Sequence, residues 1–269
     1  RLVLRWGYAR GLMDAHELRE LTAFAVESAQ LAGAFTLGYF NAGTPHELKA
    51  DRSPVTAADR GAEERLRKRI GDAYPDHGIL GEEYGETTGN GRARWILDPI
   101  DGTVSFICGV PLYAVLVGFE YDGEMVAGVI HLPALGETVW ASKGQGCWWN
   151  GRRAHVSDTR TLAQARLCTC GTKLLYEKGR GAAFERVREQ CLLDRGWSDA
   201  YAYALVATGR AEIVLDPVMS IWDNAACMPC ITEAGGSFTD WNGIATHRAN
   251  EAMATNGALL EPTLAAIRG

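Results

Sequence analysis

Hydrophobic positions in the first 75 residues recur at helical spacing. Apolar residues three or four apart predict one helix within 14–40 that ends near the Asn-Ala-Gly of 41–43. A second helix is predicted over about 56–73, following Ser53-Pro54. The apolar positions are Leu18, Leu21, Ala25, Ala29 and Ala32 in the first helix, and Ala62, Leu66, Ile70 and Ala73 in the second.

The pattern then changes to strands. Short strands are predicted near 78–80 and 94–97, and three β-rich runs at 112–120, 125–132 and 137–142 are separated by turn residues, which predicts an antiparallel meander. The second half alternates again: strand near 166–170, helices 181–193 and 199–208, strand 211–215, helix 221–234 and strand 236–240. We expect a mixed α/β chain with one subdomain over 1–155 and a second over 156–269, and a site at their junction.

Composition narrows the class of protein. The 269 residues are 47% hydrophobic and 22% charged, enough to bury a large core. The net charge of -6, with no block of Lys or Arg, argues against a nucleic-acid surface. No apolar run approaches the ~20 residues of a membrane helix. The first residues also lack the apolar core of a signal peptide, so we expect a soluble cytosolic enzyme.

The seven cysteines are interpreted as reduced core residues. Cys168 and Cys170 lie in a predicted strand, and the C-x-x-C of Cys227 and Cys230 lies inside a predicted buried helix. A redox motif would normally sit at a helix start, and a zinc site would need a second ligand pair. The odd count adds no support for a disulfide framework.

The most informative segment is Trp-Ile-Leu-Asp-Pro-Ile-Asp-Gly-Thr-Val-Ser-Phe, residues 95–106. Asp98 and Asp101 lie three residues apart where an apolar strand breaks, and Pro99 and Gly102 favour a tight bend there. Two such carboxylates can share a hard cation that prefers oxygen ligands. The amides of Gly102 and Thr103 would open the next helix, where unpaired N–H groups attract phosphate.

Further acids occur at the ends of predicted elements. Glu82 and Glu83 follow a short strand, Asp59 begins a helix, Asp216 closes a strand, and Asp223 lies in the first turn of a helix. Each has a simpler explanation. Glu82 and Glu83 could form a solvated loop, Asp59 and Asp223 could complement helix dipoles, and Ser220 with Asp223 resembles a capping box. Their ordered recurrence at element ends nevertheless favours a metal site.

These motifs resemble the inositol monophosphatase family of magnesium-dependent, lithium-sensitive phosphatases. The resemblance covers nearly the whole chain and rests on Gly-Glu82-Glu83, Asp98-Pro-Ile-Asp101-Gly-Thr103, Trp-Asp223 and Glu-Ala-Gly235-Gly236, with Ser53-Pro-Val-Thr-Ala-Ala-Asp59 and Val206-Ala-Thr-Gly209. Segments 105–112, 199–205 and 212–217 are most similar to the histidinol-phosphate phosphatase branch, although Val104 and Cys108 replace residues that are often basic or polar there. The resemblance implies a layered αβαβα sandwich of the inositol monophosphatase and fructose-1,6-bisphosphatase type, and a homodimer.

The resemblance also implies roles for individual residues. Asp98 would bridge the first two of two or three Mg²⁺ ions. Asp59 and Thr103 would orient and deprotonate the attacking water, and the amides of Gly102 and Thr103 would bind phosphate. For Asp199 a helix N-cap is the alternative. The implied metal ligands are Glu82, Asp98, the Ile100 carbonyl, Asp101 and Asp223, and Glu82 is also counted among the catalytic residues with Asp59 and Thr103. Glu83 would support the ligands, and Asp199 and Asp216 would contact the substrate.

We therefore expect hydrolysis of L-histidinol phosphate to L-histidinol and phosphate, in histidine biosynthesis. The alternatives are an inositol-1-monophosphatase or another small phosphomonoesterase, and a catalytically lapsed metal- or phosphate-binding protein. A phosphomonoester dianion repels nucleophiles, and two metal ions roughly 3.5–4 Å apart can clamp the entering and leaving oxygens. Carboxylates suit Mg²⁺, and the motifs contain none of the histidines that zinc or a phosphohistidine would use: His16, His46, His77, His131, His155 and His247.

Overall fold

The computed structural model describes residues 13–49, 54–89 and 91–269, so Ser53 of the predicted turn lies outside the described residues. The first half contains two long helices and most of the strands. Its elements are α1 (Ala15–Leu37), β1 (His46–Leu48), β2 (Pro54–Thr56), α2 (Ala57–Ala73), β3 (Gly78–Gly81), β4 (Gly85–Thr87), β5 (Ala93–Asp101), α3 (Thr103–Ile107), β6 (Ala114–Tyr121), β7 (Glu124–Leu132), β8 (Glu137–Ser142), β9 (Gly146–Trp149) and β10 (Arg152–Ala154), with a 3₁₀ turn at Pro133–Leu135.

The second half alternates strands and helices. After a 3₁₀ turn at Leu162–Gln164, its elements are β11 (Arg166–Cys168), α4 (Thr172–Glu177), α5 (Gly181–Arg188), β12 (Leu193–Arg195), α6 (Asp199–Ala207), β13 (Ile213–Asp216), α7 (Ile221–Glu233), β14 (Ser237–Thr239), β15 (Ala252–Thr255) and α8 (Leu260–Arg268). The predicted helices 14–40, 56–73, 199–208 and 221–234 and the three-stranded meander are confirmed, with small shifts at their ends.

Two large sheets organise the chain. The larger has eight strands in the order β10-β9-β8-β7-β6-β5-β3-β4, antiparallel except for the parallel pair β3 and β5. The second has five strands in the order β12-β11-β13-β15-β14, with β11 parallel to both of its neighbours. The boundary expected at residue 155 falls between β10 and β11. Strand β10 is the last strand of the larger sheet along the chain, and β11 is the first strand of the second sheet.

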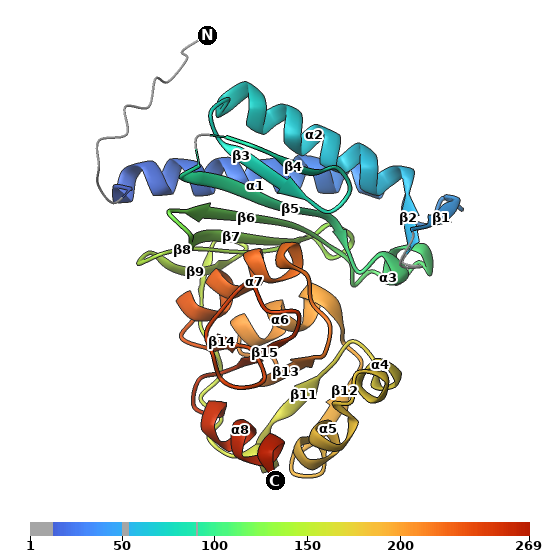
Figure 1. Ribbon diagram of the computed structural model, residues 1–269, viewed down its shortest axis with the longest axis vertical. Helices are drawn as coiled ribbons and strands as arrows, with labels where there is room; N and C mark the ends of the chain where they lie inside the picture. Colours follow the sequence, from blue (N-terminus) through green and yellow to red (C-terminus); the bar gives the residue numbers. More distant parts are fainter. Residues whose placement is uncertain (1–12, 50–53, 90) are drawn as a thin grey trace.

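The layers alternate in the order helix, sheet, helix, sheet, helix (Figure 1). Helices α1 and α2 cover one face of the larger sheet, and α6 and α7 lie between the two sheets. Helices α5 and α8 cover the far side of the second sheet. This is the αβαβα arrangement that the resemblance to the inositol monophosphatase family implies. Among residues 13–49, 54–89 and 91–269, no helix is both long and apolar enough to cross a membrane.

Strands buried on both faces explain the apolar runs. In β6, Val115 and Val117 face the core under α1 and α2, whereas Ala114 and Leu116 face the core around α6 and α7. Successive side chains in a strand point to opposite faces, so a strand between two helix layers needs apolar residues at nearly every position. The run Ala-Val-Leu-Val-Gly-Phe therefore marks the centre of the larger sheet.

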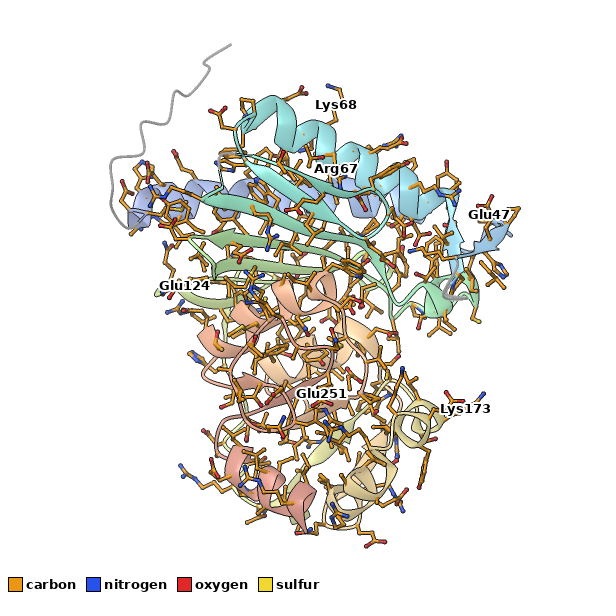
Figure 2. All side chains as sticks on the ribbon, in the orientation of Figure 1. Glu47, Arg67, Lys68, Glu124, Lys173 and Glu251 are labelled. Atoms are coloured by element: carbon orange, nitrogen blue, oxygen red, sulfur yellow. The ribbon has the colours of Figure 1, made fainter. Side chains whose placement is uncertain are left out.

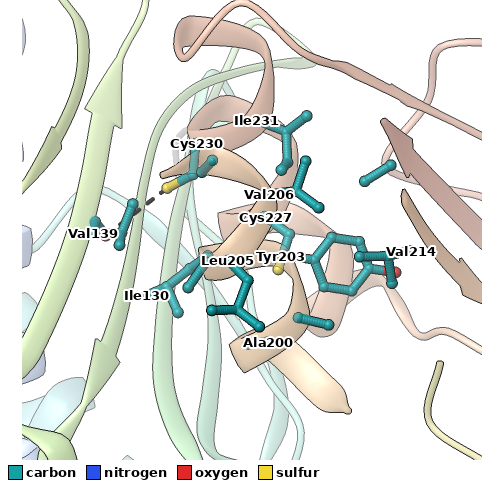
Figure 3. Packing of buried hydrophobic residues seen from close by; sticks show 14 of the residues in the cluster. Ile130, Val139, Ala200, Tyr203, Leu205, Val206, Val214, Cys227, Cys230 and Ile231 are labelled. Carbon is teal, nitrogen blue, oxygen red and sulfur yellow. Dashed lines mark hydrogen bonds between the residues drawn. The ribbon is translucent and has the colours of Figure 1, made fainter. Parts of the chain in front are cut away.

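Most of the cysteines pack as core residues, as predicted. Cys227 and Cys230 lie on α7 among side chains of the larger sheet and α6 (Figure 3). The Cys230 thiol donates to the carbonyl oxygens of Gly128 and Val139. Cys108 is exposed, so the core prediction is wrong there, because this residue caps the short surface helix α3.

The second half departs from the predicted elements at its non-local pairings. The helix predicted over 181–193 ends at Arg188, and residues 193–195 instead form β12, which pairs with β11. Helices α4 and α8 and strand β15 were not predicted. Strand β15 is the short run Ala-Met-Ala-Thr, whose β-structure depends on pairing with β13 and β14 rather than on local preference.

Two buried histidines predict acid-sensitive stability. Burial lowers the pKa of His77 and of His131 to about 4 in each case, and Trp95 donates its indole N–H to Nδ1 of His77. Each histidine has an ordinary pKa near 6.5 when the chain unfolds, so the unfolded state binds more protons between these values. The contribution of each histidine to the free energy of unfolding should be fully present above pH 6.5 and be lost as the pH drops toward 4, by at most about 3 kcal/mol per histidine.

The measurement is chemical denaturation of the unmodified protein and of His77→Gln at several pH values from 7.5 to 5. The glutamine side chain could still accept the Trp95 hydrogen bond but would not titrate. Carboxyl groups titrate in both proteins, so the difference between the two curves isolates His77. Parallel curves would contradict the assignment.

Candidate active site

A β-bulge places the two aspartates of the central motif. Strand β5 pairs with β6 up to Asp98 opposite Leu116, and the register then shifts before Asp101 pairs with Ala114. Pro99 has no N–H to give to a ladder and is accommodated in the bulge. The strand predicted to end at residue 97 therefore continues to Asp101. The Ile100 amide donates to Oδ1 of Asp98 at 3.0 Å, which fixes that carboxylate within the bulge.

Helix α7 brings a third aspartate to the bulge. Carboxylate oxygens of Asp98, Asp101 and Asp223 lie within 4.8 Å of one another. The Ser220 amide donates to Oδ2 of Asp223 at 2.7 Å, so the capping box foreseen as an alternative is present. The cap engages one carboxylate oxygen, and a metal ion could still be bound by the other. The two interpretations of Asp223 are therefore compatible.

Crowded negative charge perturbs these groups. Burial, together with the neighbouring carboxylates, raises the pKa of Asp98 and of Asp101 well above the ordinary value, and raises the pKa of Asp223 to about 7. Such a cluster is unfavourable when ionised unless a cation neutralises it. The donors are all oxygens, which fits a hard divalent cation such as Mg²⁺ and does not fit a soft metal.

A lysine lies against the glutamate pair. Nζ of Lys49 donates to Glu82 Oε1 at 2.7 Å and to Glu83 Oε1 at 2.6 Å. Burial alone would lower the pKa of Lys49, but the two carboxylates raise it above its ordinary value. The side chains of Glu82 and Glu83 are only 18% and 5% exposed, so the solvated-loop alternative is wrong. The Glu82 charge also helps to raise the pKa of Asp98 and of Asp101, which places Glu82 near the aspartates.

Asp59 and Thr103 form a hydrogen-bonded pair beside the bulge. The Thr103 hydroxyl is 3.4 Å from Oδ1 of Asp59 and 3.1 Å from the Ile100 carbonyl oxygen. The other Asp59 oxygen accepts from the amide and hydroxyl of Thr56 at the start of α2. Asp59 is fully buried, and burial raises its pKa. The pair can therefore take up a proton through the threonine hydroxyl.

Gly102 is required by its surroundings. It caps the start of α3 with φ of 81°, a conformation that side chains disfavour, and a Cβ there would lie 2.9 Å from Oδ2 of Asp199. The predicted start of a helix at Thr103 is confirmed, although α3 is only five residues long.

Asp199 approaches the cluster from α6. Its backbone is left-handed, with φ of 55°, and its Oδ2 accepts from Ser198 Oγ at 2.8 Å and lies 3.5 Å from Ser105 Oγ. Ser198 is the N-cap of α6, so Asp199 is not the cap residue. The next amide, that of Ala200, donates to Oδ2 of Asp101 at 2.6 Å. The strained turn therefore joins Asp199 to the aspartate cluster.

Asp216 lies deeper than Asp199. It is 1% exposed, and its two oxygens accept from the Cys170 amide at 3.0 Å and the Tyr203 hydroxyl at 2.9 Å. Burial raises its pKa to about 6, and the charge of Asp199 acts in the same direction. Asp216 is thus a second buried carboxylate, close enough to Asp199 for the two charges to interact.

Two residues of this region were missed from the sequence. Lys49 follows β1 and belongs to no motif, so no local signal identifies it. Glu63 is fully buried on α2 and contacts the turn that carries Glu82 and Glu83. Glu63 lies four residues after Asp59, and residues with this spacing share a helix face, which is the signal that could have found it.

The chain is similar to a family of known phosphatases. The model of the inositol monophosphatase family matches residues 17–268. A histidinol-phosphatase of Chlorobaculum parvum is 44% identical over 221 residues, covering 81% of this chain and 85% of that protein. An inositol-1-monophosphatase of Rhizobium meliloti is 37% identical over 201 residues, covering 73% and 75%. The crystal structure of the extragenic suppressor protein suhB from Bartonella henselae has a TM-score of 0.87 and 30% identity, covering 93% of this chain and 98% of that one.

Proposed function

We propose, starting from the fact that the chain belongs to the inositol monophosphatase family, that it is a Mg²⁺-dependent phosphatase acting on L-histidinol phosphate. Phosphomonoester hydrolysis is the activity of the family members to which it is similar. The observation that carries the proposal is the convergence of Asp98, Asp101 and Asp223 within 4.8 Å beside the Asp59–Thr103 pair.

The ligand set fits two or three Mg²⁺ ions. Glu82, Asp98, Asp101, Asp223 and the Ile100 carbonyl would hold them, with Asp98 shared between two. When bound, the ions would neutralise the phosphate dianion and lower the pKa of a coordinated water. Glu83 would support this set through the Lys49 contact that it shares with Glu82.

The chain's own groups then direct the water and the phosphate. Thr103 would orient the attacking water and pass its proton to Oδ1 of Asp59, while Thr56 holds the other oxygen of Asp59. The amides of Gly102 and Thr103, at the start of α3, would bind phosphate oxygens. Because Asp59 is buried and its pKa is raised, it is suited to receive a proton.

The substrate proposal rests on negative charge beyond the phosphate end. Asp199 and Asp216 would favour the cationic amine and imidazole of histidinol phosphate, a charge that an inositol phosphate lacks. Similarity to a histidinol-phosphatase supports this choice. Similarity to an inositol-1-monophosphatase favours the second candidate, hydrolysis of inositol phosphates or related small phosphomonoesters. A lapsed binding protein is disfavoured because the four acidic ligands, Asp59 and Thr103 are all present.

The test is a phosphate-release assay with Mg²⁺ on L-histidinol phosphate and myo-inositol 1-phosphate. We expect a higher kcat/KM for histidinol phosphate. Asp199→Asn should reduce that preference roughly ten- to a hundredfold, because a charge-assisted hydrogen bond contributes about 1.5–3 kcal/mol. Asp216→Asn should act in the same direction and less strongly, since Asp216 is buried with both oxygens already hydrogen-bonded.

Asparagine is the matched replacement at position 199. It tolerates the left-handed backbone of Asp199, so the Ala200 amide can still reach Asp101 and only the charge is lost. An equal loss for both substrates, or a preference of the unmodified enzyme for inositol phosphate, would overturn the substrate proposal and leave the phosphatase proposal standing.

The remaining expectations belong to the same proposal. They are a role in histidine biosynthesis, a cytosolic location, a homodimer, and a division into subdomains over 1–155 and 156–269. Sedimentation equilibrium of the purified protein tests the dimer directly. A monomer at micromolar concentration would contradict it.

A further inference from the structure

A buried glutamate of α2 contacts the turn that carries Glu82. The Glu63 carboxylate is fully buried and accepts from the amide of Glu83 at 2.8 Å and from the amide of Tyr84 at 3.2 Å. These two amides follow Glu82 directly and belong to the turn between β3 and β4. The carboxylate therefore holds the backbone of the turn, not its side chains.

An arginine completes the contact. Arg67, labelled on α2 in Figure 2, donates through Nε to Glu63 Oε1 at 2.7 Å. Its other nitrogens donate to the Gly85 carbonyl and to the Thr87 hydroxyl of β4. One side chain of α2 thus binds Glu63 and the strand that leaves the turn, so the ion pair holds the turn from Glu83 onward.

The approach of Glu63 leaves no room for a side chain on the strand that enters the turn. A Cβ at Gly81 would lie 2.0 Å from Oε1 of Glu63. Gly81 immediately precedes Glu82 and lacks a positive φ that would by itself require glycine. Its small size therefore serves the close contact with the buried carboxylate.

We infer that Glu63 is a positioning residue for the metal ligand Glu82, an inference that rests on the proposed function. The turn amides are tied to α2 by a charged acceptor, so Glu82 keeps one backbone position beside Asp98. Asp59 lies one helical turn before Glu63 on α2 and is hydrogen-bonded to Thr103. A single helix thereby sets the position of a metal ligand relative to the pair that activates water.

A comparable buried carboxylate elsewhere provides a matched control. Glu212 is also fully buried, accepts from the amide of Arg166 at 2.7 Å, and forms an ion pair with the Arg166 guanidinium. It lies beside β11 in the second sheet and contacts no proposed ligand. A loss of stability alone should appear in Glu212→Gln as well as in Glu63→Gln. A loss of metal affinity should appear only in Glu63→Gln.

The experiment measures Mn²⁺ binding to the intact protein from the electron paramagnetic resonance signal of free Mn²⁺. We expect Glu63→Gln to raise the Kd about ten- to a hundredfold, the usual effect of removing a group that supports a metal ligand. The Kd of Glu212→Gln should equal that of the unmodified protein. At saturating Mg²⁺, the kcat of Glu63→Gln should approach the unmodified value, because the Glu63 carboxylate binds the turn backbone and Arg67 rather than the Asp59–Thr103 pair.

The outcomes separate the two levels of the argument. If the unmodified protein does not bind Mn²⁺, the proposed function itself fails. If it binds and Glu63→Gln binds equally well, the positioning role is overturned while the phosphatase proposal stands. Should Glu63→Gln fail to fold, Glu63→Asp carries the same expectation, since it keeps the charge but is one methylene too short to reach the turn amides. An unchanged Kd in that variant would equally overturn the role.

Discussion

Replacement of Asp98 by asparagine is expected to lower the rate of phosphate release more than about a hundredfold. Loss of a group that only supports a metal ligand usually costs about ten- to a hundredfold, and loss of a proposed ligand itself should cost more. Asp98 is 2% exposed, its carboxylate lies within 4.8 Å of those of Asp101 and Asp223, and the charge of Glu82 acts on it as well. An amide of the same shape would keep the bulge but lose the negative charge that would hold the cations. Steady-state assays over a range of Mg²⁺ concentrations measure the effect.

Removal of the metal should have the same consequence. EDTA is expected to abolish activity, and added Mg²⁺ to restore it; from the family resemblance, lithium should inhibit. Asp122→Asn is the control for Asp98→Asn, because Asp122 pairs with Arg92 at a surface turn, away from the acidic cluster. Full turnover in EDTA, or in Asp98→Asn, would rule out the metal-dependent mechanism.

Loss of the water-activating pair should act on kcat. Asp59→Asn and Thr103→Ala are each expected to lower kcat by about 10²–10⁴, the usual contribution of a positioned proton acceptor, with smaller changes in KM. The double variant should be little worse than either single variant, because both residues act on one proton. Initial-rate kinetics at saturating Mg²⁺ measure all three proteins.

Asparagine at position 59 also controls for stability. Asp59 belongs to the capping box of α2, and asparagine is a capable partner for backbone N–H groups. Thermal melting should therefore find Asp59→Asn folded. An unchanged kcat in both single variants would mean that the proton is accepted elsewhere.

The long helices and the meander were predictable because their information is local. Helices α1 and α2 carry apolar residues at helical spacing, and they begin at capping boxes formed by Asp14 with Glu17 and by Thr56 with Asp59. Strand β12 was not predictable, because residues 193–195 become a strand only by pairing with β11. The local sequence favours a helix that continues to residue 193, but pairing with β11 makes residues 193–195 a strand instead.

The candidate site followed the same division. The spacing of Asp98 and Asp101 around Pro99 identifies them in the sequence. The bulge that accommodates them could not be predicted, because it depends on the pairing register of β5 with β6. Lys49 could not be predicted, because its contact with Glu82 joins residues that are far apart in the sequence. The left-handed backbone of Asp199 could not be predicted from local sequence either, since the hydrogen bond that follows it joins the Ala200 amide to Asp101 in the other half of the chain.

Helix α7 has a consequence for the order in which a newly made chain becomes active. It is encoded late, yet it packs against the larger sheet, whose strands are all complete by residue 154, and it delivers Asp223 to Asp98 and Asp101. Ribosomes synthesise proteins from the N-terminus, so the early half can form its sheet while still lacking one acid of the cluster. Catalytic competence would then arise in one step, when α7 has emerged and docked, and nascent fragments that stop before it would hydrolyse nothing.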